Sequence, residues 1–344
     1  MPVGNKDQDL LFNLEIDAMK KSLLALAVLG AFAGAASAQS SVTIYGKIDQ
    51  SIGKKIGTAN KEVMDNAGSR LAFRGYEDLG GGLAAVFTFE HRFFPDTGTV
   101  ASNGVVSGAT STQAFWNGYS YVGLRHKDIG TVTLGRQYTA AFLNVQTASI
   151  DPFEGEGVAA LREIGSGALY GVARVRVDNA IKYANTFGPI TVAADLAETS
   201  TPAAVGAKKP YSVAVSGVFG PAWVGIAYEN PEAVDNDVLN LAARVTFGPA
   251  TISGEYSTGK ISAATDISGL LLGAKVAVGS GNIKVGYATR KSETGSVKVT
   301  AAQRFGLGYD HNLSKRTKVY VQYARDSKVA TEKAGYEVGM QHNF

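Results

Sequence analysis

The chain has 344 residues, with 33 lysines and arginines against 30 aspartates and glutamates, and a formal net charge of +3. So small a positive excess argues against a nucleic-acid-binding surface. No cysteine occurs, which excludes disulfides and thiolate metal sites.

An export signal is predicted near the start of the chain. Lys20-Lys21 precedes an apolar run at 22–35, and the small residues 36–38 form a cleavage site before Gln39. The run is shorter than the roughly 20 apolar residues that a membrane-spanning helix needs. We therefore interpret 19–38 as a signal peptide.

Residues 1–18 do not fit this signal, because they place four acids ahead of its basic start. We interpret them as an upstream extension from a mis-assigned start codon, with Met19 as the initiator. The mature protein is then expected to comprise 39–344, one transmembrane domain.

Sixteen segments of the mature chain alternate apolar and polar residues. A period of two is typical of β-strands with two different faces. No apolar run of 18 or more residues follows the signal peptide, so a membrane could be crossed only by strands of a closed barrel. The predicted strands are 42–49, 70–75, 83–92, 114–124, 131–137, 173–184, 190–197, 211–219, 222–229, 238–247, 250–257, 269–278, 282–290, 303–310, 317–325 and 335–344.

The connections between these segments alternate between short and long. Short ones are rich in Gly and Pro, as in the three Phe-Gly-Pro turns at 187–189, 219–221 and 247–249. The pattern predicts an all-β, 16-stranded antiparallel transmembrane β-barrel with short periplasmic turns and long extracellular loops. The predicted long loops are 54–68, 93–112, 139–172, 198–210, 230–237, 258–267, 291–300 and 326–334.

The loop at 139–172 is the longest and shows no clear alternation. Long ordered loops in compact domains are usually functional. We expect this third extracellular loop to fold into the barrel lumen and narrow the channel, and we call 139–172 the constriction loop.

The last predicted strand, 335–344, ends on an aromatic residue with no tail after it. Such an ending suits a barrel strand at the membrane boundary. We expect this strand to close the barrel by pairing with 42–50. Tyr336, Val338 and Phe344 would then face outward, while Glu337 would face the lumen.

Signals for an enzyme or a cofactor are poor. No Gly-x-Ser-x-Gly elbow occurs, and a near match to a phosphate-binding loop at 254–261 has Ile261 where Ser or Thr is required. We therefore predict no catalysis, no cofactor and no metal. The four histidines show no metal-ligand spacing: His91, His126, His311 and His342.

Five stretches carry a resemblance to a known family. They are 41–46 (SVTIYG), 69–83 (SRLAFRGYEDLGGGL), 130–138 (GTVTLGRQY), 312–317 (NLSKRT) and the terminal Phe344. In these residues the chain resembles the trimeric general diffusion porins of Gram-negative outer membranes, and most of all the anion-selective porins of β-proteobacteria. The resemblance covers the whole mature chain.

The resemblance implies a homotrimer and a pore in which wall arginines face acids on or near the constriction loop. Arg70 and Arg176 match the wall arginines of the family, and Glu90 and Asp151 match the acids that face them. The period-two alternation also places Arg74 on the inward face, so we add it to the expected positive wall. The chain departs from the family at 116–119 (WNGY), where a basic residue is usual, so only weak anion preference is expected.

Parity also predicts more basic than acidic residues on the inner face, which would favour anions. Asp178 is counted among the inward acids. Arg136 falls on the outward parity, which requires either a β-bulge or a position beyond the membrane.

These features predict an outer-membrane, water-filled channel for passive diffusion of ions and small hydrophilic solutes, surrounded by lipid and binding no nucleic acid. The first alternative is a substrate-specific channel with a solute site at the constriction loop. An outer-membrane enzyme with catalytic residues at the barrel mouth, and an adhesin or structural anchor without an open lumen, are two further classes.

Overall fold

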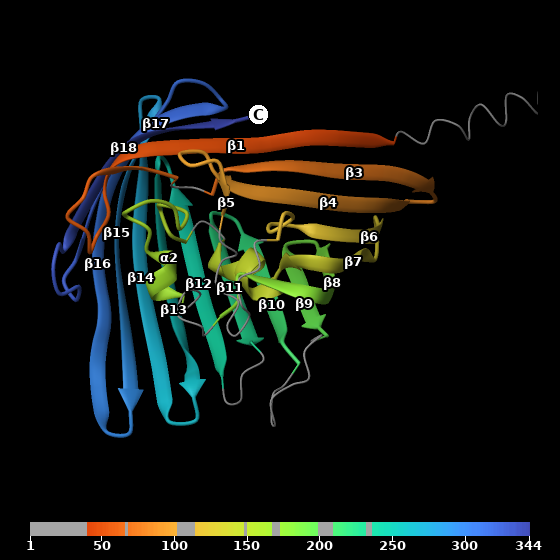
Figure 1. Ribbon diagram of the computed structural model, residues 1–344. Coiled ribbons are helices and arrows are strands. Elements are labelled where there is room, and N and C mark those ends of the chain that lie inside the picture. Colours follow the sequence, from red (N-terminus) through yellow and green to blue (C-terminus); the bar gives the residue numbers. More distant parts are fainter. Residues whose placement is uncertain are drawn as a thin grey trace, which may run out of the picture.

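The computed structural model describes residues 40–65, 68–101, 114–147, 150–166, 173–198, 209–231 and 236–344. The expected upstream extension and signal peptide lie outside these ranges. In the described part, sixteen antiparallel strands form a closed barrel, as predicted (Figure 1). The barrel strands are β1 (Ser41–Lys54), β3 (Arg70–Gly80), β4 (Leu83–Phe94), β6 (Ser120–His126), β7 (Gly130–Tyr138), β8 (Arg176–Phe187), β9 (Ile190–Ala197), β10 (Tyr211–Phe219), β11 (Ala222–Asn230), β12 (Asp237–Phe247), β13 (Ala250–Ser262), β14 (Thr265–Val278), β15 (Gly281–Thr294), β16 (Val297–Asn312), β17 (Thr317–Asp326) and β18 (Ala334–Asn343).

Two further short strands, β2 (Glu62–Met64) and β5 (Thr99–Val100), lie in the connections that follow β1 and β4. The barrel closes where β1 pairs with both β3 and β18. The pairing of β1 with β18 confirms the predicted seam, although it runs over 47–54 of β1 rather than 42–50.

The C-terminal residue fastens this seam. Gly46 and Phe344 exchange two backbone hydrogen bonds of 3.1 Å. A Cβ at position 46 would lie 2.4 Å from Cζ of Phe344, so the ring covers the glycine closely. Only glycine leaves room for the terminal aromatic ring at this point.

The alternation in the sequence divides the strands into two faces, as expected for a barrel in lipid. In β18, Val338 and Met340 are 56% and 54% exposed on the outer face, whereas Glu337 is 1% exposed on the inner face. Glu337 faces inward as predicted, but the constriction loop covers it, because Val158 N–H donates to its carboxylate at 2.8 Å.

Two connections that were predicted to be long loops are tight hairpins. β13 and β14 are separated only by residues 263–264, and β15 and β16 only by 295–296. The predictions for 258–267 and 291–300 are therefore wrong. The polar residues there resemble loop residues in composition, but Thr265, Val297 and Val299 are β-branched and extend the ladders.

The predicted strand at 114–124 is also wrong at its start, since β6 begins at Ser120. Asn117 does not pair through its backbone as a strand residue does. Its side chain forms hydrogen bonds with the backbone of β4 and of the loop that follows β4. Its Oδ1 accepts from Arg92 N at 2.7 Å and its Nδ2 donates to Ala101 O at 2.8 Å. Side-chain bonds of this kind compete with regular pairing.

A β-bulge corrects the predicted parity of Asp178. The register between β7 and β8 shifts between Gly135 and Gln137, and Asn179 has a positive φ of 52°. Arg136 forms a 2.5 Å ion pair with Asp178, which is 55% exposed, and both side chains lie on the outward parity. Asp178 therefore does not contribute to the lumen charge. The extra residue lies in β8, so the bulge does not change the face of Arg136, which stays on the outward parity predicted for it and is met there by Asp178.

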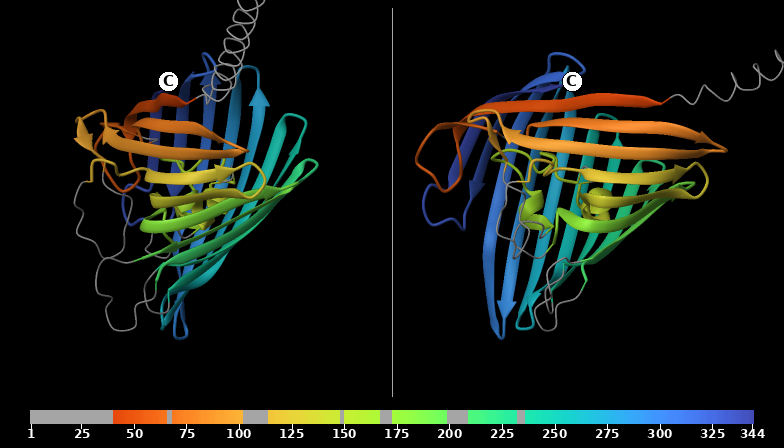
Figure 2. Two further views of the ribbon diagram at one scale, coloured as in Figure 1. Left: turned by 90° about the vertical axis from the view of Figure 1, so that its right-hand side faces the viewer. Right: turned by 45° about the vertical axis from the view of Figure 1, so that its right-hand side comes forward.

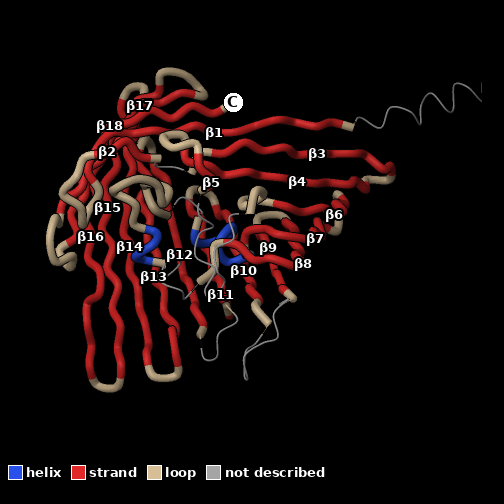
Figure 3. Tube along the Cα trace, in the orientation of Figure 1, coloured by secondary structure: helices blue, strands red, loops and turns tan. Residues whose placement is uncertain are grey.

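The described parts of the constriction loop, 139–147 and 150–166, lie inside the barrel. They contain the short helical segments η1 (Phe142–Gln146) and α2 (Arg162–Gly165). Both segments are enclosed by strands in two rotated views (Figure 2), and they are the helical parts of the described fold (Figure 3). The loop thus narrows the lumen, as predicted.

Glycines on the inner face of β14, β15 and β16 allow the loop to pack against this side of the barrel. A Cβ on Gly269 would lie 2.1 Å from Gly165 O, and one on Gly286 would lie 2.4 Å from Cδ1 of Leu161. At this contact Phe153, Leu161 and Ile164 are each at most 1% exposed. We call this surface the glycine seat, and it comprises Gly269, Gly273, Gly286, Gly306 and Gly308.

We expect Gly269→Ala to displace α2 from the glycine seat, because its Cβ would overlap a backbone oxygen that cannot rotate away. Overpacking of this kind costs about 1–3 kcal/mol. Single-channel recording should show an altered and less steady conductance. Gly254→Ala on β13 is the control, since its Cβ would meet its nearest atom at an ordinary 3.4 Å. A steady, wild-type conductance in Gly269→Ala would contradict the expectation.

Candidate constriction site

The extracellular ends of β3, β4 and β8 carry three arginines on the inner face, and we call Arg70, Arg92 and Arg176 the basic wall. Arg70 and Arg92 are directly paired across β3 and β4. Glu90 lies between them, where its carboxylate accepts from Arg92 Nε at 2.7 Å and lies 3.9 Å from Arg70 Nη1. Glu90 is 2% exposed, so it partly neutralises the wall instead of facing it from the loop.

Tyr138, the last residue of β7, connects two of these arginines. Its hydroxyl accepts hydrogen bonds from Arg92 Nη2 at 2.5 Å and from Arg176 Nη2 at 3.1 Å. The Cζ atoms of Arg92 and Arg176 lie 5.9 and 4.7 Å from the centre of its ring. The ring also stacks on Phe142 of the loop at 5.2 Å. Tyr138 therefore holds the two guanidinium groups at one point of the wall.

The constriction loop presents two glutamates and one arginine to the basic wall. Glu154, Glu156 and Arg162 line, with the basic wall, a cavity of about 340 Å³. Glu156 is bound by Lys47 of β1 at 2.6 Å, which joins the loop to the wall. Four arginines thus surround this cavity against two glutamates, one of which is paired with a lysine.

Asp151 does not line the 340 Å³ cavity, and its side chain is buried within the constriction loop. Its carboxylate accepts four backbone N–H groups of the loop, those of Phe153, Gly155, Leu161 and Arg162, at 2.7–3.0 Å. The residue is 3% exposed. Its negative charge is therefore surrounded by loop amides, and its position makes it a structural centre of the loop.

Arg74 also lies away from the cavity. It is exposed on β3, four residues beyond Arg70 towards the periplasmic turn, with its Cζ 5.2 Å from the ring of Tyr45. Of the residues predicted for the constriction, the structure brings together Arg70, Arg176 and Glu90. It places Arg74 and Asp151 outside that group.

Five polar or charged residues that line the cavity or bind its arginines were not predicted as site residues: Arg92, Tyr138, Glu154, Glu156 and Arg162. Arg92 shares the inward parity of Glu90, so the alternation in β4 was a usable signal. The run Glu154-Gly155-Glu156-Gly157 is a polar turn in an otherwise apolar loop segment, which also could have indicated exposed loop acids. Arg162 had no such signal, because its direction depends on how the loop folds.

Side chains of the wall hold the loop in place by binding its backbone. Carboxylates and amides accept loop N–H groups, and serines donate to loop carbonyls. Each bond satisfies a polar group that would otherwise be buried without a partner. These contacts join Asp195 to Ala140, Ser253 to Ile150, Ser257 to Gly165, Glu337 to Val158 and Gln322 to Ala159. Glu229 binds the backbone of Arg174, just after the loop, in the same way.

Glu163 of α2 is an acid of the constriction loop that should gain a proton under mild acidification. Burial raises the pKa of its carboxyl above the usual value, and the nearby Arg162 and Arg304 only partly oppose this shift. Glu163 lines a second cavity, of about 260 Å³, with Asp65 and Arg304. Burial also raises the pKa of Asp65.

We expect mild acidification to increase anion preference. A carboxyl with a raised pKa gains its proton at a higher pH than an ordinary carboxyl does, so Glu163 and Asp65 lose their negative charge under mild acidification. Glu163→Gln should show the increased preference already at neutral pH and respond less to acid. Reversal potentials recorded at a series of pH values test this, and an unchanged pH response in the variant would contradict it.

The described residues contain no group of three histidine or acidic side chains placed to hold a metal ion. None of the helices in the described ranges has the length and apolar character needed to cross a membrane.

Comparison with known proteins agrees with this architecture. A Gram-negative porin family profile matches residues 25–331. The chain is 31% identical to outer membrane porin protein 32 of Delftia acidovorans and 28% identical to an outer membrane porin protein of Bordetella pertussis, each over 95% of this chain and 100% of the relative. Among solved structures, the anion-selective porin from Comamonas acidovorans superposes with a TM-score of 0.71 at 26% identity, covering 89% of this chain and 100% of that one.

Porins are passive channels and not enzymes, so the family also gives the class of function and the compartment. The family profile matches most of the chain, and the Delftia porin is 31% identical over its whole length. The chain therefore belongs to the Gram-negative porin family and is an outer-membrane porin.

Proposed function

We propose that this porin passes ions and small hydrophilic solutes with a weak preference for anions. The observation that carries the proposal is the 340 Å³ cavity between the constriction loop and the basic wall, where four arginines oppose two glutamates. Rings of positive side chains at a narrow point favour anions. The anion-selective porin from Comamonas acidovorans supports the same direction by similarity.

The preference is weak because acids lie among the arginines. Glu90 is bonded to Arg92, and Glu156 is bonded to Lys47, so each reduces the local field. No basic residue stands in 116–119 to add to the wall. Salt at physiological strength screens charges beyond roughly 8 Å, which leaves only the narrow region selective.

A planar-bilayer recording of the wild-type protein under a gradient of potassium chloride tests the proposal. A reversal potential of the sign set by chloride is expected. A potential set by potassium would contradict anion preference, and the absence of conductance steps would contradict an open channel.

The assembly that we propose is a homotrimer. An aromatic patch on the outer face of β3, β4 and the segment before β6 supports it, with Trp116 in ring contact with Phe73, Phe89 and Phe115 at 6.3, 5.4 and 4.9 Å. Phe115 is 58% exposed in the single chain. On the outer wall of a barrel such a cluster meets either lipid or a neighbouring subunit, and we assign this one to the subunit contact. Native mass spectrometry should give three chains, and a monomer under mild detergent would contradict the proposal.

A further inference from the structure

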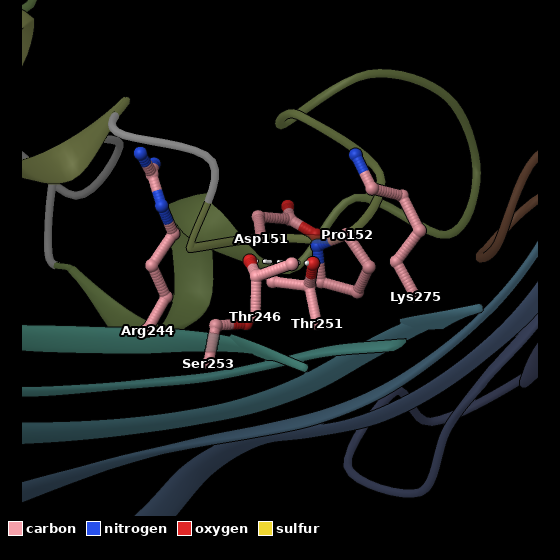
Figure 4. A pocket seen from close by; sticks show the side chains of 7 residues that line it. All are labelled: Asp151, Pro152, Arg244, Thr246, Thr251, Ser253 and Lys275. Carbon is pink, nitrogen blue, oxygen red and sulfur yellow. Dashed lines mark hydrogen bonds between the residues drawn. The ribbon is translucent and has the colours of Figure 1, made fainter. Parts of the chain in front are cut away.

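A separate cavity lies beneath the constriction loop, on the side of the periplasmic turns. It has a volume of about 180 Å³ and lies between the loop residues Asp151 and Pro152 and the inner faces of β12, β13 and β14 (Figure 4). Its wall residues stand near the strand ends that lead into the short turns at 248–249 and 279–280. The 340 Å³ cavity has none of these lining residues.

Two cationic side chains flank this cavity, Arg244 from β12 and Lys275 from β14 (Figure 4). The Arg244 guanidinium lies over the ring of Trp223, with its Cζ 5.3 Å from the ring centre. Lys275 makes no hydrogen bond or ion pair with any residue that the structure describes. A half-buried ammonium that is not hydrogen-bonded to the protein is a strong donor for an anion.

Hydroxyl groups complete the lining. Thr246 and Thr251 are opposite each other on β12 and β13, and their Oγ1 atoms lie 3.0 Å apart. One hydroxyl donates to the other, which leaves one hydroxyl hydrogen for a ligand. Ser253 is already used, because it donates to Ile150 O at 2.5 Å.

The one acid in the lining, Asp151, offsets one of the two positive charges at most, so the side chains of the lining keep a net positive charge. Four loop N–H groups bind its carboxylate, so its oxygens are already engaged on the loop side. The cavity therefore combines two cations and a free hydroxyl donor with an acid that is occupied elsewhere.

We propose that this cavity, which we call the lower site, binds a small oxyanion of the inorganic phosphate class. The separate oxygens of such an anion can accept hydrogen bonds from an ammonium, a guanidinium and a hydroxyl at the same time. A chloride ion is a single atom and has no separate acceptors to direct at these three groups. The lower site rests on the proposed anion preference, because it would receive anions that have passed the basic wall. It adds a binding step on the periplasmic side of the pore.

The test uses the full-length protein in a planar bilayer with chloride as the current carrier. Inorganic phosphate added to the periplasmic side should reduce the chloride current in a saturable way. Arg244→Gln with Lys275→Gln removes two charge-assisted contacts and should raise the half-blocking concentration by at least about tenfold. Lys275→Gln alone should give an intermediate shift, and regular single-channel steps without phosphate, whatever their size, show that each variant is folded.

Lys318→Gln is the matched control. Lys318 lies on the inner face near the periplasmic end of β17 and is bonded to Asp310 at 3.3 Å, outside the cavity lining. Its loss removes one positive charge from the same vestibule and should leave phosphate block unchanged. An equal loss of block in Lys318→Gln would overturn the proposal in favour of a diffuse field.

Two outcomes separate this proposal from the function on which it rests. Anion-preferring reversal potentials without any saturable phosphate block would overturn the lower site and leave the proposed function standing. A cation-preferring wild-type channel would overturn the proposed function, whatever phosphate does.

Discussion

Replacement of Arg70 and Arg176 by glutamate should reverse the ion preference of the channel from anions to cations. Both side chains line the 340 Å³ cavity, so each substitution exchanges a positive for a negative charge where the constriction loop faces the basic wall. At a few ångströms in an aqueous pore a unit charge contributes on the order of 1 kcal/mol, before screening by salt. We expect the chloride-to-potassium permeability ratio to fall by at least about tenfold, or about 1.4 kcal/mol.

The reversal potential under a salt gradient measures this ratio. Arg70→Lys with Arg176→Lys is the control, because it keeps both charges but loses the planar guanidinium that contacts Tyr138. The lysine variant should keep the sign of the wild-type potential. If the glutamate variant also kept that sign, the basic wall would not determine selectivity.

The second large effect concerns Asp151, which should act through loop structure and not through its charge at the pore. Its Oδ2 accepts three loop N–H groups and its Oδ1 a fourth. In Asp151→Asn the amide NH₂ must face at least one of these donors. A buried donor without a partner costs about 1–3 kcal/mol, enough to populate other loop positions. We expect frequent conductance fluctuations around a larger mean, with the barrel itself still folded.

Glu154→Gln is the matched control for this prediction. It also removes one negative charge from the constriction loop, but no hydrogen bond to the Glu154 carboxylate occurs among the described residues. It should therefore shift the reversal potential towards anions and leave the current steady. A steady current in Asp151→Asn, with only a shift of selectivity, would show that Asp151 acts as a pore charge after all.

Much of the barrel could be predicted because strand alternation is a local property. A side chain in a strand points to one face or the other according to its position in a period of two, whatever the rest of the chain does. Inward positions such as Arg70 and Glu90 followed from this rule. It failed at Asp178, where a bulge and the positive φ of Asn179 change the face, and at 258–267, where polar strands resemble loops.

The candidate site was less predictable because it combines a wall and a loop. Parity identifies the wall residues but gives no information about 139–172, which has no period. Asp151 and Glu154 are both acids of the same loop, yet one is bound by four amides and the other lines the cavity. Only the folded loop distinguishes them.

The sequence by itself determined the class of protein, the strand number, most of the inward and outward positions and the compartment, because these follow from short-range alternation and from the stretches that resemble porins. The tertiary structure decided which charges face one another across the pore. Those contacts join residues far apart in the chain, such as Lys47 with Glu156, 109 positions away, and Val158 with Glu337, 179 positions away. The path of the constriction loop through the lumen depends on its contacts with the glycine seat and with the wall side chains that bind its backbone. No local pattern in the loop sequence carries that information.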